Sequence, residues 1–143
     1  MGVDREINYA KMRSVKKAKI GRIIIPASTN PWPHEERVAR ILALAGYVVE
    51  FIPEAGIKTP DIYLNGKIFE IKSPVSNNIG AVERNLVKAL AKSQNIVFDS
   101  SRMKIRDEKI ISELIKRRRE GKRLKKILLI DKQGKIIDIE RFV

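Results

Sequence analysis

The first half of the chain alternates between strand-like and helix-like spacing of its apolar residues. Residues 22–25 and 47–52 are rich in β-branched and aromatic side chains, which predicts two strands. Between them, apolar residues recur at intervals of three and four and predict a helix over residues 33–45, with Gly46 as its stop. Residues 4–19 are polar with scattered apolar positions, so they predict at most a marginal helix or a basic arm.

A β-hairpin is predicted next. Two short strand patterns, 61–64 and 67–72, are separated by Asn65-Gly66, a dipeptide that favours a two-residue turn. Large apolar residues occur at both alternating sets of positions, so we expect both faces of this hairpin to be buried.

The second half repeats the alternation of helices and strands. A helix followed by a strand favours a crossover that returns the chain to the same sheet. The patterns predict a helix over 79–93, a strand over 95–98, a helix over 107–120 and a closing hairpin of 126–131 with 135–139.

The length and composition favour an α/β protein with one compact domain. The chain has 143 residues, of which 43% are hydrophobic, enough for a single core. Within it we expect a basic arm and short strand over 1–32 and the main domain over 33–143. The sequence contains neither an apolar run of the roughly 20 residues that a membrane span requires nor the apolar centre of a signal peptide.

The net charge of +13 favours a polyanionic partner, and nucleic acid is the leading candidate. The alternative is a solvated, lysine-rich surface that keeps the protein in solution. The segment 104–126 holds eleven basic and four acidic residues. We predict that four of its cations contact phosphates, although cations near the end of a helix also suit its negative dipole. These four are Arg117, Arg118, Lys122 and Arg123.

The predicted hairpin places two carboxylates opposite each other. With a two-residue turn at 65–66, Asp61 pairs with Glu70, and Lys72 follows on the same face. Opposed like charges destabilise a sheet unless something compensates them. Because the chain has no cysteine and a single histidine, a compensating metal needs oxygen ligands, which predicts Mg²⁺ or Mn²⁺ on Asp61 and Glu70.

These residue types suit the hydrolysis of a phosphodiester. A divalent cation neutralises the phosphate and lowers the pKa of a bound water, while the Lys72 ammonium orients or deprotonates the water or stabilises the growing charge. The alternative is a salt-bridge ladder on an exposed face. Glu35 shares the apolar stripe of the first helix, so we predict that it faces inward as a further catalytic and metal-binding carboxylate. Trp32, between two prolines, is predicted to pack as a lid on the core, with base stacking as the alternative.

Pro60-Asp61 followed by Glu70-Ile71-Lys72 resembles the signature of the PD-(D/E)xK nuclease superfamily. Residues 34–99 as a whole are similar to the C-terminal tRNA-nuclease toxin domains of contact-dependent growth inhibition (CdiA-type) proteins. The resemblance implies a restriction-endonuclease-like core in which helices flank a mixed β-sheet. It also implies that Asp61, Glu70 and Glu35 bind metal and that Lys72 is catalytic. Relatives often have glutamine where this chain has Lys92, with Gln94 nearby, so a polar role for the second helix is open.

The same resemblance implies tRNA as the substrate and a cognate immunity protein as a partner. It further implies delivery as the C-terminal domain of a secreted or surface toxin and action in the cytoplasm. Two other functions remain open on sequence grounds: a DNA endonuclease of a mobile element, and a nucleic-acid-binding protein without catalysis. Contacts from Lys and Arg to phosphate do not distinguish RNA from DNA. The oligomeric state is also open.

Overall fold

The computed structural model of the chain describes residues 5–8, 19–56 and 58–143. It has two compact units, Met1–Ile68 and Phe69–Val143, and each is described by itself below. Both units combine helices with a mixed parallel and antiparallel sheet, so the prediction of a mixed α/β protein is confirmed.

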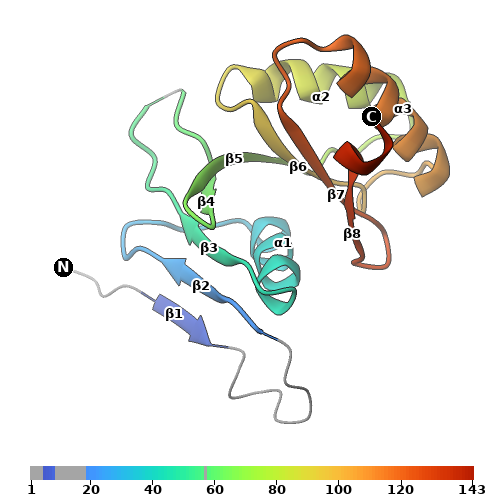
Figure 1. Cartoon of the computed structure of the whole chain (residues 1–143). Helices are drawn as coiled ribbons and strands as arrows, with labels where there is room; N and C mark the ends of the chain where they lie inside the picture. The colour runs from blue at the N-terminus through green and yellow to red at the C-terminus, as the bar shows by residue number, and fades with distance from the viewer. Residues whose placement is uncertain (1–4, 9–18, 57) are drawn as a thin grey trace. The chain divides into compact units, whose positions relative to one another are not determined.

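The first unit is a four-stranded sheet with one helix. Strand β1 is antiparallel to β2, β2 is parallel to β3, and β3 is antiparallel to β4. Helix α1 connects the two parallel strands and packs against them (Figure 1). The elements are β1 (Arg5–Asn8), β2 (Arg22–Ile25), α1 (Pro33–Leu44), β3 (Val48–Phe51) and β4 (Ile62–Leu64).

Residues 5–8 form a strand, so the expectation of a marginal helix or arm is wrong there. Residues 4 and 9–18, on which the rest of that expectation falls, lie outside the described residues. Helix α1 forms as predicted because Val38, Ala39 and Leu42 share one face and are fully buried. It ends before Gly46, whose φ of +105° is a conformation that side chains rarely adopt.

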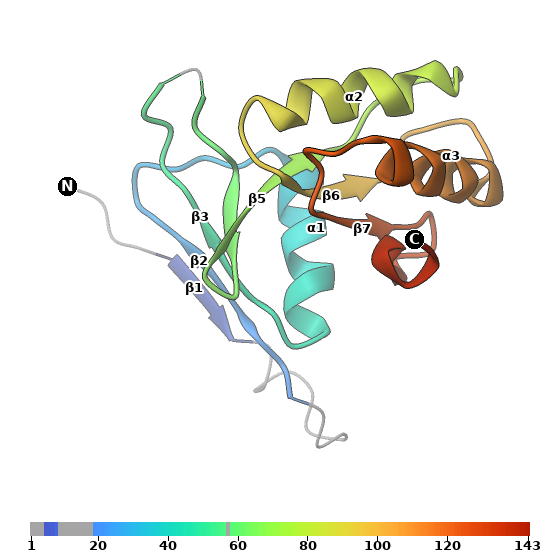
Figure 2. The same ribbon diagram turned by 45° about the horizontal axis from the view of Figure 1, so that its top comes forward.

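The second unit contains the other four strands and two helices. Strands β5, β6 and β7 are parallel neighbours, and β8 is antiparallel to β7. The predicted crossover is present, since α2 connects the parallel strands β5 and β6, and α3 makes a second one between β6 and β7. Figure 2 shows α2 and α3 side by side over the strands. The elements are β5 (Lys67–Lys72), α2 (Gly80–Leu90), β6 (Asn95–Asp99), α3 (Asp107–Glu120), β7 (Lys126–Ile130), β8 (Ile136–Asp138) and the 3₁₀ helix η2 (Ile139–Phe142).

The core of the second unit lies between this sheet and the two helices. Strand β6 is buried on both faces, as a central parallel strand should be. The helices contribute Val82 and Leu86 from α2 and Ile110 and Leu114 from α3, all at or close to zero exposure. This packing fixes α2 against β6 and so also fixes the position of the residues that directly follow α2.

The turn after β4 has the predicted conformation, with φ of +49° at Asn65 and +82° at Gly66. Asn65 also accepts a hydrogen bond from the backbone N–H of Val48 at 2.8 Å through its side-chain oxygen, which ties the turn to β3. Burial on both sides of the hairpin was predicted incorrectly near this turn. Tyr63 and Ile68 are exposed, whereas Ile62 and Leu64 at the alternate positions of β4 are buried, so β4 is covered on one face only.

Among the described residues, no helix has the length and apolar character needed to cross a bilayer.

Candidate active site

Glu70 lies in the middle of β5, between the buried side chains of Phe69 and Ile71, and is itself 1% exposed. Two ammonium groups approach the same carboxylate oxygen. The Nζ atom of Lys72 is 3.4 Å from Oε2 of Glu70, and the Nζ atom of Lys92 is 3.6 Å from it. The buried carboxylate is therefore compensated by two cations within the second unit.

This arrangement has more positive than negative charge. A buried carboxylate needs one cation to offset the cost of removing it from water. The second ammonium group leaves a net positive charge, and the side chains of Lys72 and Lys92 are 20% and 28% exposed, so both reach solvent. The group can thus attract an anion such as a phosphate from solution while Glu70 stays buried.

Lys92 was not predicted as a site residue. It lies just after α2, and its backbone N–H donates to the carbonyl of Ala89 at 2.9 Å. Ala89 is fully buried against the sheet. A position three residues after a buried helix residue lies on nearly the same side of the helix. From the sequence alone, that spacing indicates that Lys92 lies on nearly the same side of the helix as Ala89.

A second polar network lies directly after Lys72. The Ser73 hydroxyl donates to Oδ2 of the buried Asp99 at 2.9 Å, and the Ser101 hydroxyl donates to the same oxygen at 3.1 Å. Arg102 donates from Nε and a terminal nitrogen to the carbonyl of Ser73, with Nε at 3.0 Å. These bonds fix the end of β5 against β6 and thereby hold the backbone on which Lys72 stands.

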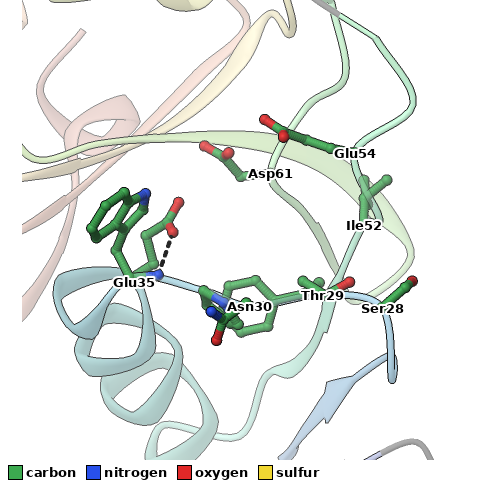
Figure 3. A pocket seen from close by; sticks show the side chains of 10 residues that line it. Ser28, Thr29, Asn30, Glu35, Ile52, Glu54 and Asp61 are labelled. Carbon is green, nitrogen blue, oxygen red and sulfur yellow. Dashed lines mark hydrogen bonds between the residues drawn. The ribbon is translucent and has the colours of Figure 1, made fainter. Parts of the chain in front are cut away.

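Glu35 and Asp61 line one pocket of about 310 Å³ in the first unit. Figure 3 shows their carboxyl groups and that of Glu54 at the cavity, with Ser28 and Thr29 along another wall. Glu35 is half-buried and lines this pocket. Its role as a metal ligand stays a prediction.

Glu35 also caps the first turn of α1. Its Oε1 accepts a hydrogen bond from the backbone N–H of Trp32 at 2.8 Å, so one free N–H of the helix end is satisfied. The Trp32 side chain is 69% exposed and borders the pocket, so its prediction as a lid on the core is wrong.

The predicted triad is divided between the two units. Asp61 belongs to the first unit, whereas Glu70 and Lys72 belong to the second. The pairing of Asp61 with Glu70 therefore remains a prediction from the sequence. Within the part of the chain that the structure describes, no three acidic or histidine side chains form a group that could hold a metal ion.

The predicted phosphate-binding residues of α3 differ in their surroundings. Arg117 pairs with Glu83, Glu113 and Glu120, with its Nε 2.6 Å from Glu113. Arg118 donates to both carboxylate oxygens of Glu140 at 2.9 and 3.0 Å. The carboxylates around these two guanidinium groups hold them against the protein. Their role in phosphate binding is untested.

Lys122 and Arg123 lie in the loop after α3 and are exposed. Arg123 makes one weak contact, a 3.5 Å hydrogen bond from a terminal nitrogen to the carbonyl of Leu90. Both cations can reach a ligand in solution, so the loop matches the prediction of an exposed basic surface better than the helix does.

The comparisons with known proteins agree with one another. The family model of the contact-dependent growth inhibition CdiA C-terminal domain matches residues 58–136, more than half of the chain. Among solved structures, the chain is similar to one in the CdiA-CT/CdiI toxin and immunity complex from Burkholderia pseudomallei. That match has a TM-score of 0.62 and 25% identity and covers 78% of this chain and 93% of the other. No curated protein sequence matches the chain. The chain belongs to the family of contact-dependent growth inhibition CdiA C-terminal domains.

Proposed function

We propose that the chain is a toxin domain that hydrolyses phosphodiester bonds in nucleic acid, with tRNA as its substrate. The observation that carries the proposal is the buried Glu70 with the ammonium groups of Lys72 and Lys92 beside it. A lysine held by a buried carboxylate has a fixed position at which it can meet a phosphate. The CdiA family and the net charge of +13 support a nucleic-acid substrate for this site.

The catalytic assignment extends the sequence prediction. Asp61 and Glu70 would hold a divalent cation, with Glu35 as a further acid, and Lys72 would act on the water or the phosphate. These donors are oxygen atoms only, which suits Mg²⁺ or Mn²⁺ and excludes a site built on thiolates. When bound, the cation would supply charge neutralisation and an acidified water.

The chain's own residues perform the remaining steps of the proposed reaction. Lys72, anchored by Glu70, binds the non-bridging phosphate oxygens and stabilises the charge that grows on them during attack. Lys92 supplies a second positive charge next to Lys72 and so increases the attraction of the phosphate. Glu70 holds both ammonium groups at one oxygen, Oε2, and so keeps the two positive charges side by side.

The similarity to a CdiA-CT toxin also suggests a partner protein. The similar toxin from B. pseudomallei occurs in a complex with an immunity protein. We propose that this domain is likewise delivered into the cytoplasm of a target cell and that a cognate immunity protein blocks it in the producing cell. A net charge of +13 favours an acidic surface on that partner.

Cleavage assays test the proposed function. Purified protein is incubated with total tRNA, plasmid DNA and single-stranded DNA, with Mg²⁺ or with EDTA. We expect cleavage of tRNA that requires the metal and that falls by roughly a hundredfold or more in Asp61→Asn and in Glu70→Gln. The matched control is Glu108→Gln, an exposed acid at the start of α3.

The other outcomes identify the competing functions. Cleavage of DNA alone would identify a DNA endonuclease, and binding of all three nucleic acids without cleavage would identify a binding protein. Lys72→Arg keeps the positive charge but replaces the compact ammonium with a broad guanidinium. We expect it to lose most activity with little change in affinity for tRNA. Wild-type turnover in this variant would leave Lys72 only an electrostatic role.

A further inference from the structure

The pocket of the first unit has features that the proposed hydrolysis does not use. Trp32 is the only tryptophan of the chain, is 69% exposed and borders the pocket of about 310 Å³. It also borders a second hollow together with Pro33 and Glu36, so space is open on both sides of it. An exposed aromatic ring between two prolines is a surface on which a nucleic-acid base can stack.

The polar groups of the pocket form two chemically different walls. Glu35, Glu54 and Asp61 present carboxylates, which only accept hydrogen bonds when ionised. Thr29 and Asn30 belong to the β2–α1 loop and can donate (Figure 3). The Thr29 hydroxyl oxygen has almost no exposed surface, whereas the Asn30 side chain is exposed, so Asn30 is the donor of this wall that a ligand can reach.

We propose that this pocket binds an unstacked guanine base, with Trp32 as the stacking surface and Glu54 as the group that selects the base. This proposal rests on the proposed function, since the guanine would belong to the nucleic acid that is cleaved. Glu54 is exposed and lines the pocket beside Asp61, so it is accessible to a base while Asp61 serves the cation (Figure 3).

The choice of guanine follows from hydrogen-bond complementarity. Guanine has two adjacent donors, N1–H and the N2 amino group, which fit the two oxygens of one carboxylate. Its O6 and N7 accept hydrogen bonds and fit donors such as the side-chain amide of Asn30. Adenine and cytosine place an acceptor beside their single amino group, and the ring N–H of uracil lies between two acceptors. Against a carboxylate, each of these acceptors would be repelled.

Fluorescence of Trp32 tests the proposal directly, because the chain has no other tryptophan. The protein is titrated with GMP, AMP, CMP and UMP in EDTA, so that neither metal binding nor cleavage contributes. We expect saturable quenching by GMP at concentrations at least roughly tenfold lower than for the other three nucleotides. Glu54→Gln should weaken GMP binding roughly tenfold and leave AMP binding unchanged, because an amide offers one acceptor instead of two.

Glu108→Gln is the matched control and should bind GMP like the wild type. Equal quenching by all four nucleotides, or no saturable quenching by GMP, would overturn the guanine pocket. Unchanged GMP affinity in Glu54→Gln would overturn the role of Glu54. The two proposals fail in different ways. A protein that prefers GMP but cleaves no nucleic acid would support the guanine pocket and contradict the proposed function. A protein that cleaves tRNA without preferring GMP would support the proposed function and contradict the guanine pocket.

Discussion

The Nζ atom of Lys92 lies 3.6 Å from Oε2 of Glu70, the oxygen that Lys72 approaches at 3.4 Å. A lysine at the end of a helix thus shares a buried carboxylate with a lysine two residues along the strand. Either ammonium group alone can compensate the charge of Glu70. The pair therefore provides redundancy for folding, and it leaves Lys72 able to act on a ligand.

This redundancy predicts strong coupling between two substitutions. Lys72→Met and Lys92→Met should each cost about 1 kcal/mol or less, because the other lysine still compensates Glu70. The double variant removes both ammonium groups from Oε2 of the buried Glu70 and should cost about 3–5 kcal/mol. Urea unfolding of the four proteins at neutral pH measures the cycle. If the two single costs add up to the double cost within about 0.5 kcal/mol, the lysines act independently and the redundancy is refuted.

The elements of this fold were largely predictable because local signals determine them. Helix α3 has the predicted bounds, and the positive φ angles at Asn65 and Gly66 were expected from their identities alone. The first strand was missed. Residues 5–8 carry little apolar periodicity of their own, and their strand is defined by pairing with β2, a contact distant in sequence.

The surroundings of the site residues were less predictable than the elements. Sequence spacing gave no reason to connect Lys92 with Glu70, since their contact depends on how α2 packs against β6. Burial of Trp32 was predicted from its position between two prolines. Its ring is 69% exposed, so that position does not indicate burial here.

Arg118 illustrates how a cation of the predicted binding surface contributes to stability instead. Its guanidinium pairs with both oxygens of Glu140 and donates to the carbonyl of Lys125 at 3.1 Å. Arg118→Gln leaves the half-buried Glu140 without its main partner, so we expect a loss of about 1–3 kcal/mol in the free energy of unfolding. Urea denaturation measures it, with the exposed Lys122→Gln as the control. Equal stability of the two variants would show that the Arg118 pair contributes nothing.

Asp107 predicts a dependence of stability on pH. Burial raises the pKa of this carboxyl, but hydrogen bonds from the Ser100 hydroxyl and from the backbone and ammonium groups of Lys132 outweigh that effect and lower the pKa below its ordinary value. A lowered pKa in the folded state means that the ionised form stabilises the fold above the unfolded value of about 3.9, and that this contribution is lost as the pH falls through the folded value.

Comparison of the wild type with Asp107→Asn isolates this contribution. The variant should be less stable at pH 7, and the difference in unfolding free energy should narrow as the pH falls below about 4. Urea unfolding at a series of pH values from 7 down to about 2 measures both curves. A constant difference across the series would show that the ionisation of Asp107 does not contribute.

The exposed loop after α3 provides the sharpest test of nucleic-acid binding by the second unit. Lys122 and Arg123 reach solvent, so each phosphate that they contact would release counterions, whereas Arg118 is already paired with Glu140. In an Asp61→Asn background that prevents cleavage, replacing Lys122 and Arg123 with Gln should weaken tRNA binding. It should also make the slope of log affinity against log salt shallower by roughly 1.5, since each phosphate contact accounts for about 0.7–0.9.

The control replaces Lys58 and Lys67, two exposed lysines of the first unit, with Gln and removes the same charge. If both double variants change the slope equally, net charge alone governs binding; a slope unchanged by the loss of Lys122 and Arg123 would exclude the loop from the tRNA interface.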